Sequence, residues 1–235
     1  MDLEPRLLYL DPYLAAFHKP SGLLCQPGLG PDLADSLITR VQQRWPELRL
    51  VHRLDRDTSG LLLLASTPLV HRQLSGLFAG RAIHKVYGAE VAGHPRAQGG
   101  LIDWPLARIG TRPPRYGPLP VDQGGKPAIT HWRVLQRRWD GQGRPIARLL
   151  LVPRTGRSHQ LRVHLEQIGH PILGDPIYGS APGVAEGLAA GADRLRLHAL
   201  GLRFRHPATG KPLRLRCPAP WDNPDGPSSV LPTHG

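Results

Sequence analysis

The 235-residue chain is poor in several residue types, and each shortage argues against a class of protein. Its two cysteines, Cys25 and Cys217, lie far apart and outside any CxxC or Cys/His motif. Neither a disulfide framework nor a zinc-binding motif is therefore indicated. Twelve histidines are present, but no HExxH motif or matching carboxylate spacing accompanies them. We expect no metal and no other cofactor.

Long apolar runs and a secretory N-terminus are also missing. No stretch approaches the roughly 18 consecutive apolar residues that a membrane-spanning helix needs, so we expect no contact with a membrane. The N-terminus carries Asp2 and Glu4 before a very short apolar stretch, a pattern that is wrong for a secretory signal. These features predict a cytoplasmic protein.

Acidic residues are scarce relative to basic ones. The chain has 18 Asp and Glu against 30 Lys and Arg, which gives a net charge of +12 and a pI near 10.8. Such an excess favours a polyanionic partner, and nucleic acid is the first candidate. The alternative is a solvated basic surface or an arginine-rich source genome. The charge indicates a partner class but no chemistry.

The stretch VHRLDRDTSGLLLLA, residues 51–65, combines charge with a core element. The apolar run from Leu61 to Ala65 follows Gly60 and is typical of a strand buried on both faces. Asp55 and Asp57 then lie in the loop that leads into this strand, where a rigid neighbour holds a carboxylate still. The alternative is that both carboxylates only cap a turn.

Strands outnumber helices along the rest of the chain, and short turns join many of them. This pattern predicts an α+β fold around a mainly antiparallel sheet, with no sign of a second domain. The proline-rich tail 223–235 is expected to be disordered. The expected helices span residues 31–45, 68–78 and 160–168, and the expected strands span 7–10, 14–17, 61–65, 85–92, 128–135, 147–152, 197–204 and 212–216.

The expected helix 160–168 lies in an unusually basic stretch. Six arginines and histidines fall between Arg154 and His170, an arrangement that would be odd for an ordinary surface. We expect Arg162 to be anchored by the apolar side of the helix and to project its guanidinium into a cleft. A forked, permanently charged donor keeps an opposing carboxylate ionised and aimed. A surface arginine on an amphipathic helix is the alternative.

Four ordered segments resemble the RluA-type pseudouridine synthases. They are HRLDRDTSGLLLLA from His52, KPSGLLCQPG from Lys19, KVYGAEVAG from Lys85 and TGRSHQLRVHLEQIGHPILGDPIYG from Thr155. The similarity extends from about Leu7 to Pro218 and is closest to the compact branch that lacks an S4-like RNA-binding domain. That branch acts on uridines in hairpin loops of large-subunit ribosomal RNA and the tRNA anticodon stem-loop.

The resemblance implies a fold, a function and a set of partners. It implies a mixed sheet of about eight strands, flanked by helices and loops, with a central catalytic cleft. One catalytic domain would span residues 1–222. The chain would be an isomerase that acts, as a monomer, on hairpin loops of structured rRNA or tRNA. Which uridine it modifies is left open, because the segment 183–191 and the stretch Arg115–Gly117 differ from the family pattern.

The resemblance also implies roles for individual residues. Asp55 matches the catalytic aspartate, Tyr87 the aromatic residue that stacks on the target base, and Arg162 the basic residue that pairs with the aspartate. Arg53 matches the arginine that enters the RNA helix where the base has left. We expect further RNA contacts from a set of neighbouring polar and basic residues: His52, Arg56, Thr58, Lys85, Arg157 and His159.

The implied reaction breaks the N1–C1′ bond of uridine, turns the uracil and joins C5 to C1′. One carboxylate can start it, either as a nucleophile or as a base, and the sequence leaves these open. The target nucleotide must leave its stack, at a cost of a few kcal/mol. Two other functions remain as alternatives: an RNA-binding module without catalysis, and a hydrolase that pairs Asp55 with Asp57 or Asp175.

Overall fold

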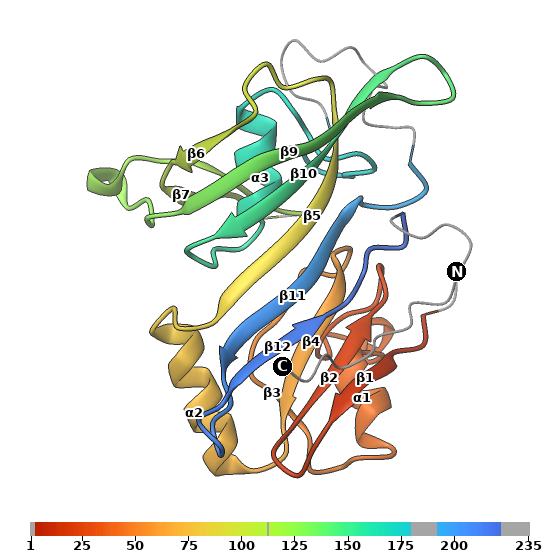
Figure 1. The fold of residues 1–235 in the computed structure, drawn as a ribbon, viewed down its shortest axis with the longest axis vertical. Coiled ribbons are helices and arrows are strands. Elements are labelled where there is room, and N and C mark those ends of the chain that lie inside the picture. The colour runs from red at the N-terminus through yellow and green to blue at the C-terminus, as the bar shows by residue number, and fades with distance from the viewer. Residues whose placement is uncertain (1–2, 112, 180–191, 222–235) are drawn as a thin grey trace. The chain divides into compact units, whose positions relative to one another are not determined.

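The structure, a computed structural model, describes residues 3–111, 113–179 and 192–221 (Figure 1). The expected disordered tail 223–235 and the segment 183–191 lie outside these residues. The chain forms two compact units: unit 1 comprises Met1–Lys85 and His198–Gly235, and unit 2 comprises Val86–Leu197. No shift in composition marks this division, and the single catalytic domain over 1–222 stays a prediction.

Unit 1 is built on a sheet with the strand order β1-β2-β4-β11. Strand β12 extends the sheet beside β11, and the short β3 pairs with the end of β4. All of these pairs are antiparallel except β4 with β11, which is parallel. The strands are β1 (Arg6–Leu10), β2 (Leu14–Lys19), β3 (Arg49–Leu50), β4 (Ser59–Ala65), β11 (Leu197–Arg205) and β12 (Pro212–Arg216).

Strand β4 forms the centre of unit 1, and all seven of its residues are buried, as its unbroken apolar run predicts. The helix α2 (Pro68–Ala79) follows it. Thr67 caps α2 by accepting the Val70 amide, and Pro68 occupies its first turn. Val70 and Leu74 of α2 pack with Leu61 and other buried residues of the sheet, so the helix covers one face of it.

The expected helix over residues 31–45 is wrong in its extent. The chain forms a 3-10 turn (Pro31–Leu33) and then the short helix α1 (Leu37–Gln42). Ser36 is extended, and its side chain caps α1 reciprocally with Thr39. The backbone at Ser36 and Leu37 also pairs with Leu24. These bonds to a distant segment stop the helix from starting earlier.

Unit 2 is built on an antiparallel sheet with the order β5-β10-β9-β6. A separate hairpin, β7 with β8, precedes a 3-10 turn (Val121–Gln123). Helix α3 (Gln160–Gln167) lies against β9 and β10 (Figure 1), and its Leu161 and Leu165 pack with buried residues of these strands. The strands are β5 (His84–Ala92), β6 (Gly99–Asp103), β7 (Leu106–Thr111), β8 (Pro114–Pro118), β9 (Ile129–Trp139) and β10 (Pro145–Pro153).

The prediction of an α+β fold with mainly antiparallel strands is confirmed. Strands β6, β7 and β8 are absent from the sequence-based expectation. They are rich in glycine, proline and arginine, and most of their residues are exposed, so no alternating apolar pattern marks them. Strands at a sheet edge or in a lone hairpin bury few side chains, so they do not need an alternating apolar pattern.

Candidate functional site

The loop 52–58 leads into the buried strand β4 and carries Asp55. Asp55 is half-buried, and its carbonyl accepts a turn hydrogen bond from the Thr58 amide at 3.2 Å. Because the next seven residues are all buried, the loop continues directly into the most rigid part of unit 1. The Asp55 backbone is therefore held in place, as its position before a core strand predicts.

The segment 19–25 also fixes the loop 52–58, through hydrogen bonds to its backbone. The Lys19 ammonium is fully buried and donates to three carbonyl oxygens, those of Pro20, Leu23 and Arg56, at 2.7 to 2.8 Å. Burial lowers the pKa of Lys19 to about 8. The carbonyl of Arg56 also accepts the Gly22 amide at 3.0 Å. A buried cation thus joins two segments that share no regular secondary structure.

Three further hydrogen bonds link the same segments. The Ser21 hydroxyl donates to the Asp57 carbonyl at 2.6 Å. The Cys25 thiol donates to the Leu54 carbonyl at 3.3 Å, and the Leu54 amide donates back to the sulfur at 3.2 Å. The residues on both sides of Asp55 are therefore fixed by side chains from segment 19–25.

Helix α3 of unit 2 is buried from Gln160 to Glu166, including its polar residues. Arg162 is only 2% exposed and donates to both carboxylate oxygens of Asp175, at 2.8 Å through Nε and 2.7 Å through Nη2. Asp175 also accepts the amides of Ile177 and Tyr178, each at 2.9 Å. This two-point bond fixes the plane of the guanidinium. Arg162 is therefore not the surface arginine that the sequence left open as an alternative.

Tyr178 joins Arg162 to the start of α3. Its ring lies 5.0 Å from the Arg162 guanidinium carbon, a cation–π distance. Its hydroxyl accepts the Tyr116 amide and is hydrogen-bonded to His159 Nδ1, both at 2.9 Å. His159 has a left-handed backbone, with φ of 55°, directly before α3. Burial raises the pKa of Tyr178, so its hydroxyl stays protonated near neutral pH.

The residues expected to contact RNA differ in their surroundings. Arg53 and Arg56 are exposed, and Arg56 Nε donates to the Gly22 carbonyl. Lys85 is partly buried, and burial lowers its pKa to about 8. Arg157 is partly exposed and donates to the Pro127 carbonyl at 3.1 Å. These residues keep basic groups at or near the surface.

Two members of the expected RNA-contacting set face the interior. Thr58 is 3% exposed. The His52 ring stacks on Phe78 with centroids 4.4 Å apart, and its Nε2 accepts the Leu63 amide at 3.0 Å. Burial, followed by the nearby charge of Lys85, lowers the pKa of His52 to about 3, so the ring is neutral. Both residues support the loop 52–58, and an RNA contact from either stays a prediction.

The expected site residues fall into two groups, one in each unit. Asp55 and Arg53 share the loop 52–58 of unit 1, whereas Arg162 and His159 share α3 of unit 2. Tyr87 lies on β5, half-buried opposite Leu151 of β10. The pairing of Asp55 with Arg162 stays a prediction.

Sequence reasoning missed three residues that build these surroundings. Lys19, Asp175 and Tyr178 all lie in the quoted motifs but received no positioning role. The spacing in GDPIYG, with a carboxylate three residues before a tyrosine, was the available signal for an arginine clamp. No comparable local pattern marks a lysine that bonds to a carbonyl oxygen 37 residues away.

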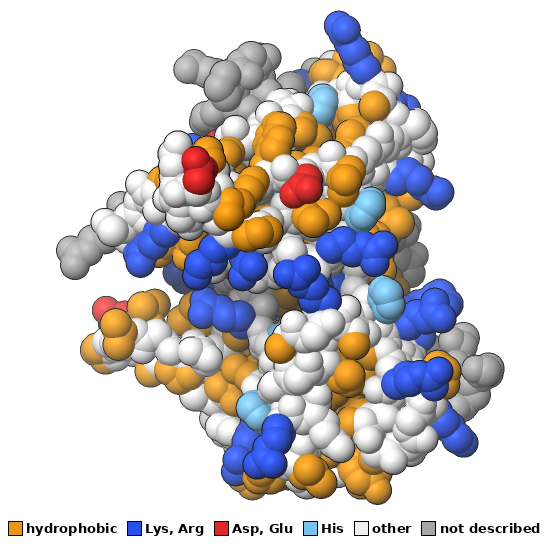
Figure 2. Space-filling model, turned by 90° about the vertical axis from the view of Figure 1, so that its left-hand side faces the viewer, with side chains coloured by type: hydrophobic (Ala, Val, Ile, Leu, Met, Phe, Trp, Pro, Cys, Tyr) orange, Lys and Arg blue, Asp and Glu red, His pale blue; other side chains and the backbone are white. Residues whose placement is uncertain are grey.

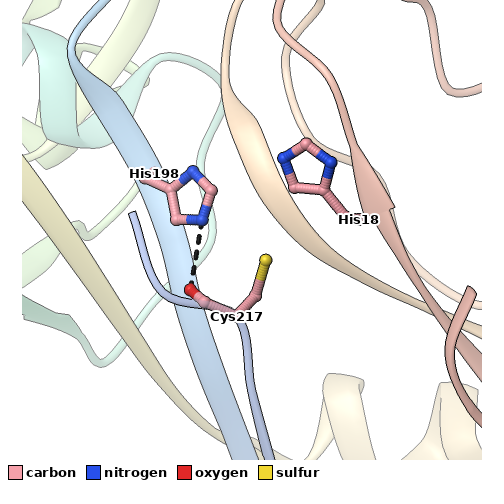
Figure 3. Close-up of side chains that lie close together, drawn as sticks. All are labelled: His18, His198 and Cys217. Carbon is pink, nitrogen blue, oxygen red and sulfur yellow. Dashed lines mark hydrogen bonds between the residues drawn. The ribbon is translucent and has the colours of Figure 1, made fainter. Parts of the chain in front are cut away.

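Three potential metal ligands converge in unit 1, although they are remote in sequence (Figure 3). Donor atoms of His18, His198 and Cys217 lie within 4.8 Å of one another. His198 uses Nδ1 for a bond with Ser59 Oγ at 2.8 Å and Nε2 for the Cys217 carbonyl at 3.1 Å. Burial raises the pKa of the Cys217 thiol to about 12. A metal ion would have to displace that proton and a His198 bond, so the geometry fits a hydrogen-bonded core contact better.

The surface carries the basic excess that the composition predicts. Figure 2 shows one face on which Lys and Arg side chains clearly outnumber Asp and Glu. Among the described residues, no helix is both long and apolar enough to cross a membrane. The surface charge therefore fits a polyanionic ligand.

Comparison with known proteins identifies the family. The model of the RNA pseudouridylate synthase family matches residues 13–167. The dual-specificity RNA pseudouridine synthase RluA of Yersinia pestis is 43% identical over 213 residues, covering 91% of this chain and 98% of the relative. The protein of the same name from Escherichia coli (strain K12) is 42% identical over 213 residues, covering 91% and 92%.

A solved structure agrees with the sequence relatives. Human RNA pseudouridylate synthase domain containing 1 has a TM-score of 0.77 and 28% identity, over 93% of this chain and 84% of that chain. The family match, the sequence relatives and the fold point to one conclusion. This chain belongs to the RNA pseudouridylate synthase family, whose members are isomerases that act on RNA.

Proposed function

We propose that the protein converts uridine to pseudouridine in structured RNA and that the Asp55 carboxylate starts the reaction. The observation that carries the assignment to Asp55 is the anchoring of its loop. Carbonyl oxygens at Leu54, Arg56 and Asp57 all accept hydrogen bonds from segment 19–25. A reactive group needs this kind of fixed backbone, because misplacement by about 1 Å can cost about a hundredfold in rate.

The reaction consumes no water and needs no redox step. The N1–C1′ bond breaks, the uracil turns and C5 joins C1′; the C5 proton leaves to solvent or to a base, and N1 takes up a proton in its place. Asp55 either attacks the ribose or uracil as a nucleophile or removes a ribose proton. Its half-buried position suits both roles, since a partly exposed residue can meet a substrate while its surroundings limit its motion.

We assign three supporting roles by motif position. Tyr87 stacks on the target base, which would return about 1 to 3 kcal/mol of the cost of unstacking it. Arg162 supplies the positive charge that keeps the catalytic carboxylate ionised, and its bidentate bond to Asp175 supports this role by holding the guanidinium rigid. Arg53, exposed in the loop 52–58, fills the space that the base leaves in the RNA.

The hydrolase alternative loses one of its two candidate carboxylates. Asp175 accepts four hydrogen bonds, two from Arg162 and two from backbone amides. These four bonds occupy the acceptor sites of both carboxylate oxygens, so neither oxygen is directed at a substrate. Asp175 is therefore better suited to holding Arg162 than to attacking a glycosidic bond.

We further propose the substrates and the setting of the reaction. Hairpin loops of 23S rRNA and the tRNA anticodon stem-loop are the proposed targets, in keeping with the motifs shared with the compact branch and with relatives called dual-specificity enzymes. Such RNA is cytoplasmic, and we propose that the protein acts there as a monomer. The +12 net charge supports binding to the RNA backbone.

The test is release of tritium from RNA labelled at uridine C5, with no added metal. We expect release by the full chain and none by Asp55→Asn, which should still bind RNA and melt at nearly the same temperature. Asp57→Asn is the matched control, because it removes a carboxylate from the same loop and should retain activity. Free uracil in place of tritium release would support a hydrolase, and RNA binding without either product would support a binding module.

A further inference from the structure

A basic pocket in unit 2 combines Arg157, one of the expected RNA contacts, with residues that have no role so far. It has a volume of about 440 Å³, within the range of roughly 300 to 1,000 Å³ that is usual for small-ligand sites. Its lining includes three cationic side chains, an aromatic ring and a hydroxyl: Arg108, Lys126, Arg157, Tyr116 and Ser158. Among the described residues that line it, none carries a carboxylate.

Strand β7 brings these side chains together. Arg108 of β7 is paired with Tyr116 of β8 in the hairpin register, so the two residues are direct cross-strand neighbours. On the other side of β7, Leu106 and Lys126 exchange two backbone hydrogen bonds at 2.8 and 2.9 Å. Arg157 reaches the same place from the start of α3, since its Nε donates to the Pro127 carbonyl. Backbone pairing therefore sets the positions of the basic residues.

The cations are arranged for an anion. Arg108 donates through Nε and Nη2 to the carbonyls of Gly110 and Thr111, at 3.1 and 3.2 Å, which limits the freedom of its guanidinium. Lys126 and Arg108 are exposed, whereas Arg157 is partly buried. Three like charges around one pocket repel one another, and a phosphate group between them would remove that repulsion.

Tyr116 gives the pocket an aromatic wall. Its ring meets His159 edge to face, with centroids 5.2 Å apart, and its amide donates to the Tyr178 hydroxyl. Because Tyr178 also contacts Arg162, a ligand resting on Tyr116 would be held at a fixed position relative to Arg162. Stacking on such a ring accepts any base, because every base has a π face.

We propose that this pocket binds one unpaired nucleotide of the RNA substrate, with its phosphate among Arg108, Lys126 and Arg157 and its base against Tyr116. The inference rests on the proposed function. It adds a second contact point for the RNA, in addition to the target uridine. The pocket positions the RNA rather than reacting with it. Its loss should weaken binding while leaving turnover by the bound complex nearly unchanged.

The experiment measures binding of a fluorescent tRNA transcript to the full chain over a range of salt concentrations. Lys126→Ala and Arg108→Ala should each weaken binding about three- to tenfold and reduce the slope of log K against log salt by about one. Tyr116→Ala should weaken binding about 5- to 150-fold, whereas Tyr116→Phe should bind like the unchanged protein. Melting temperatures of all variants show whether they fold.

Arg133→Ala is the matched control, since Arg133 is an exposed arginine of β9 in the same unit and does not line the pocket. It should change affinity by less than twofold. Equal losses in Arg133→Ala and the two cation variants would overturn the pocket, because the basic surface as a whole would then explain binding. Wild-type affinity in the pocket variants would overturn it as well.

Tritium release by the unchanged protein separates the two proposals. If it turns over RNA but the pocket variants bind normally, only the pocket is refuted. If it releases no tritium, the proposed function fails, whatever the pocket variants do. A free nucleoside monophosphate that binds the protein more tightly than the transcript would refute RNA as the occupant.

Discussion

Replacement of Asp175 by asparagine tests the clamp on Arg162. The change keeps the shape of the side chain but removes its charge and one of its acceptor oxygens. Two bonds between ionised partners, at 2.7 and 2.8 Å, would be lost or weakened. A hydrogen bond to a charged group contributes about 1.5 to 3 kcal/mol, so we expect Asp175→Asn to lower the free energy of unfolding by about 3 to 5 kcal/mol.

The assay is thermal and urea unfolding of the full chain, together with tritium release at a temperature where the variant is folded. For a chain of this size, the expected loss corresponds to a fall of about 6 to 20 °C in melting temperature. We also expect kcat to fall more than KM rises, because the guanidinium is less well aimed while the RNA contacts remain.

Asp193→Asn provides a matched comparison in the same unit. Asp193 pairs with Arg196 at 3.1 Å, but its side chain is 62% exposed, so the loss should be below about 1 kcal/mol. Similar unfolding free energies for Asp175→Asn and the unchanged protein would refute the clamp. Lower stability with full activity in the folded variant would limit Asp175 to a structural role.

Two further predictions concern unit 1. Gly60→Ala should lower the free energy of unfolding by more than about 3 kcal/mol or prevent folding, because Gly60 has a φ of +114° and a Cβ there would lie 2.5 Å from the Ala199 backbone. Gly76→Ala, in the open interior of α2, is the control and should be neutral or stabilising. An equally mild effect at Gly60 would contradict the close approach of the two backbones. For Lys19, the folded pKa of about 8 lies below the ordinary 10.5, so the unfolded chain binds more protons between these values and stability should rise with pH there. Lys19→Met should be less stable overall and should lack that part of the rise in urea unfolding. An identical pH slope in the two proteins would show that folding does not lower the pKa of Lys19.

The sequence predicts the elements that bury a continuous or periodic apolar pattern. Strand β4 and helix α2 were predicted because the leucine run and the Thr67-Pro68 cap are local signals. Helix α1 was placed too early, because its start depends on backbone bonds to Leu24, which no local pattern reveals. The hairpin of β7 and β8 was missed for a different reason: most of its residues are exposed or only partly buried, so no apolar pattern marks its strands.

The candidate site also has features that the sequence predicts and features that it does not. The loop of Asp55 and the buried strand behind it follow from the sequence, since charge and apolar run are adjacent. The bonds that hold the loop come from Lys19, Ser21 and Cys25, more than twenty residues away, and only the folded chain brings them there. The basic stretch around Arg162 drew attention to this residue, and its role in the reaction stays a prediction. Its bond to Asp175 was missed, because that bond depends on how the chain folds back after α3.

The enclosure of α3 affects how large mutant collections of this protein should be interpreted. From Gln160 to Glu166 every residue is buried, so most replacements will lower the amount of folded protein in the cell. A screen that scores only RNA modification would assign chemical importance to the entire helix. Measuring protein abundance for each variant in parallel, and dividing the modification signal by it, would separate residues that act in the reaction from residues that only stabilise the fold.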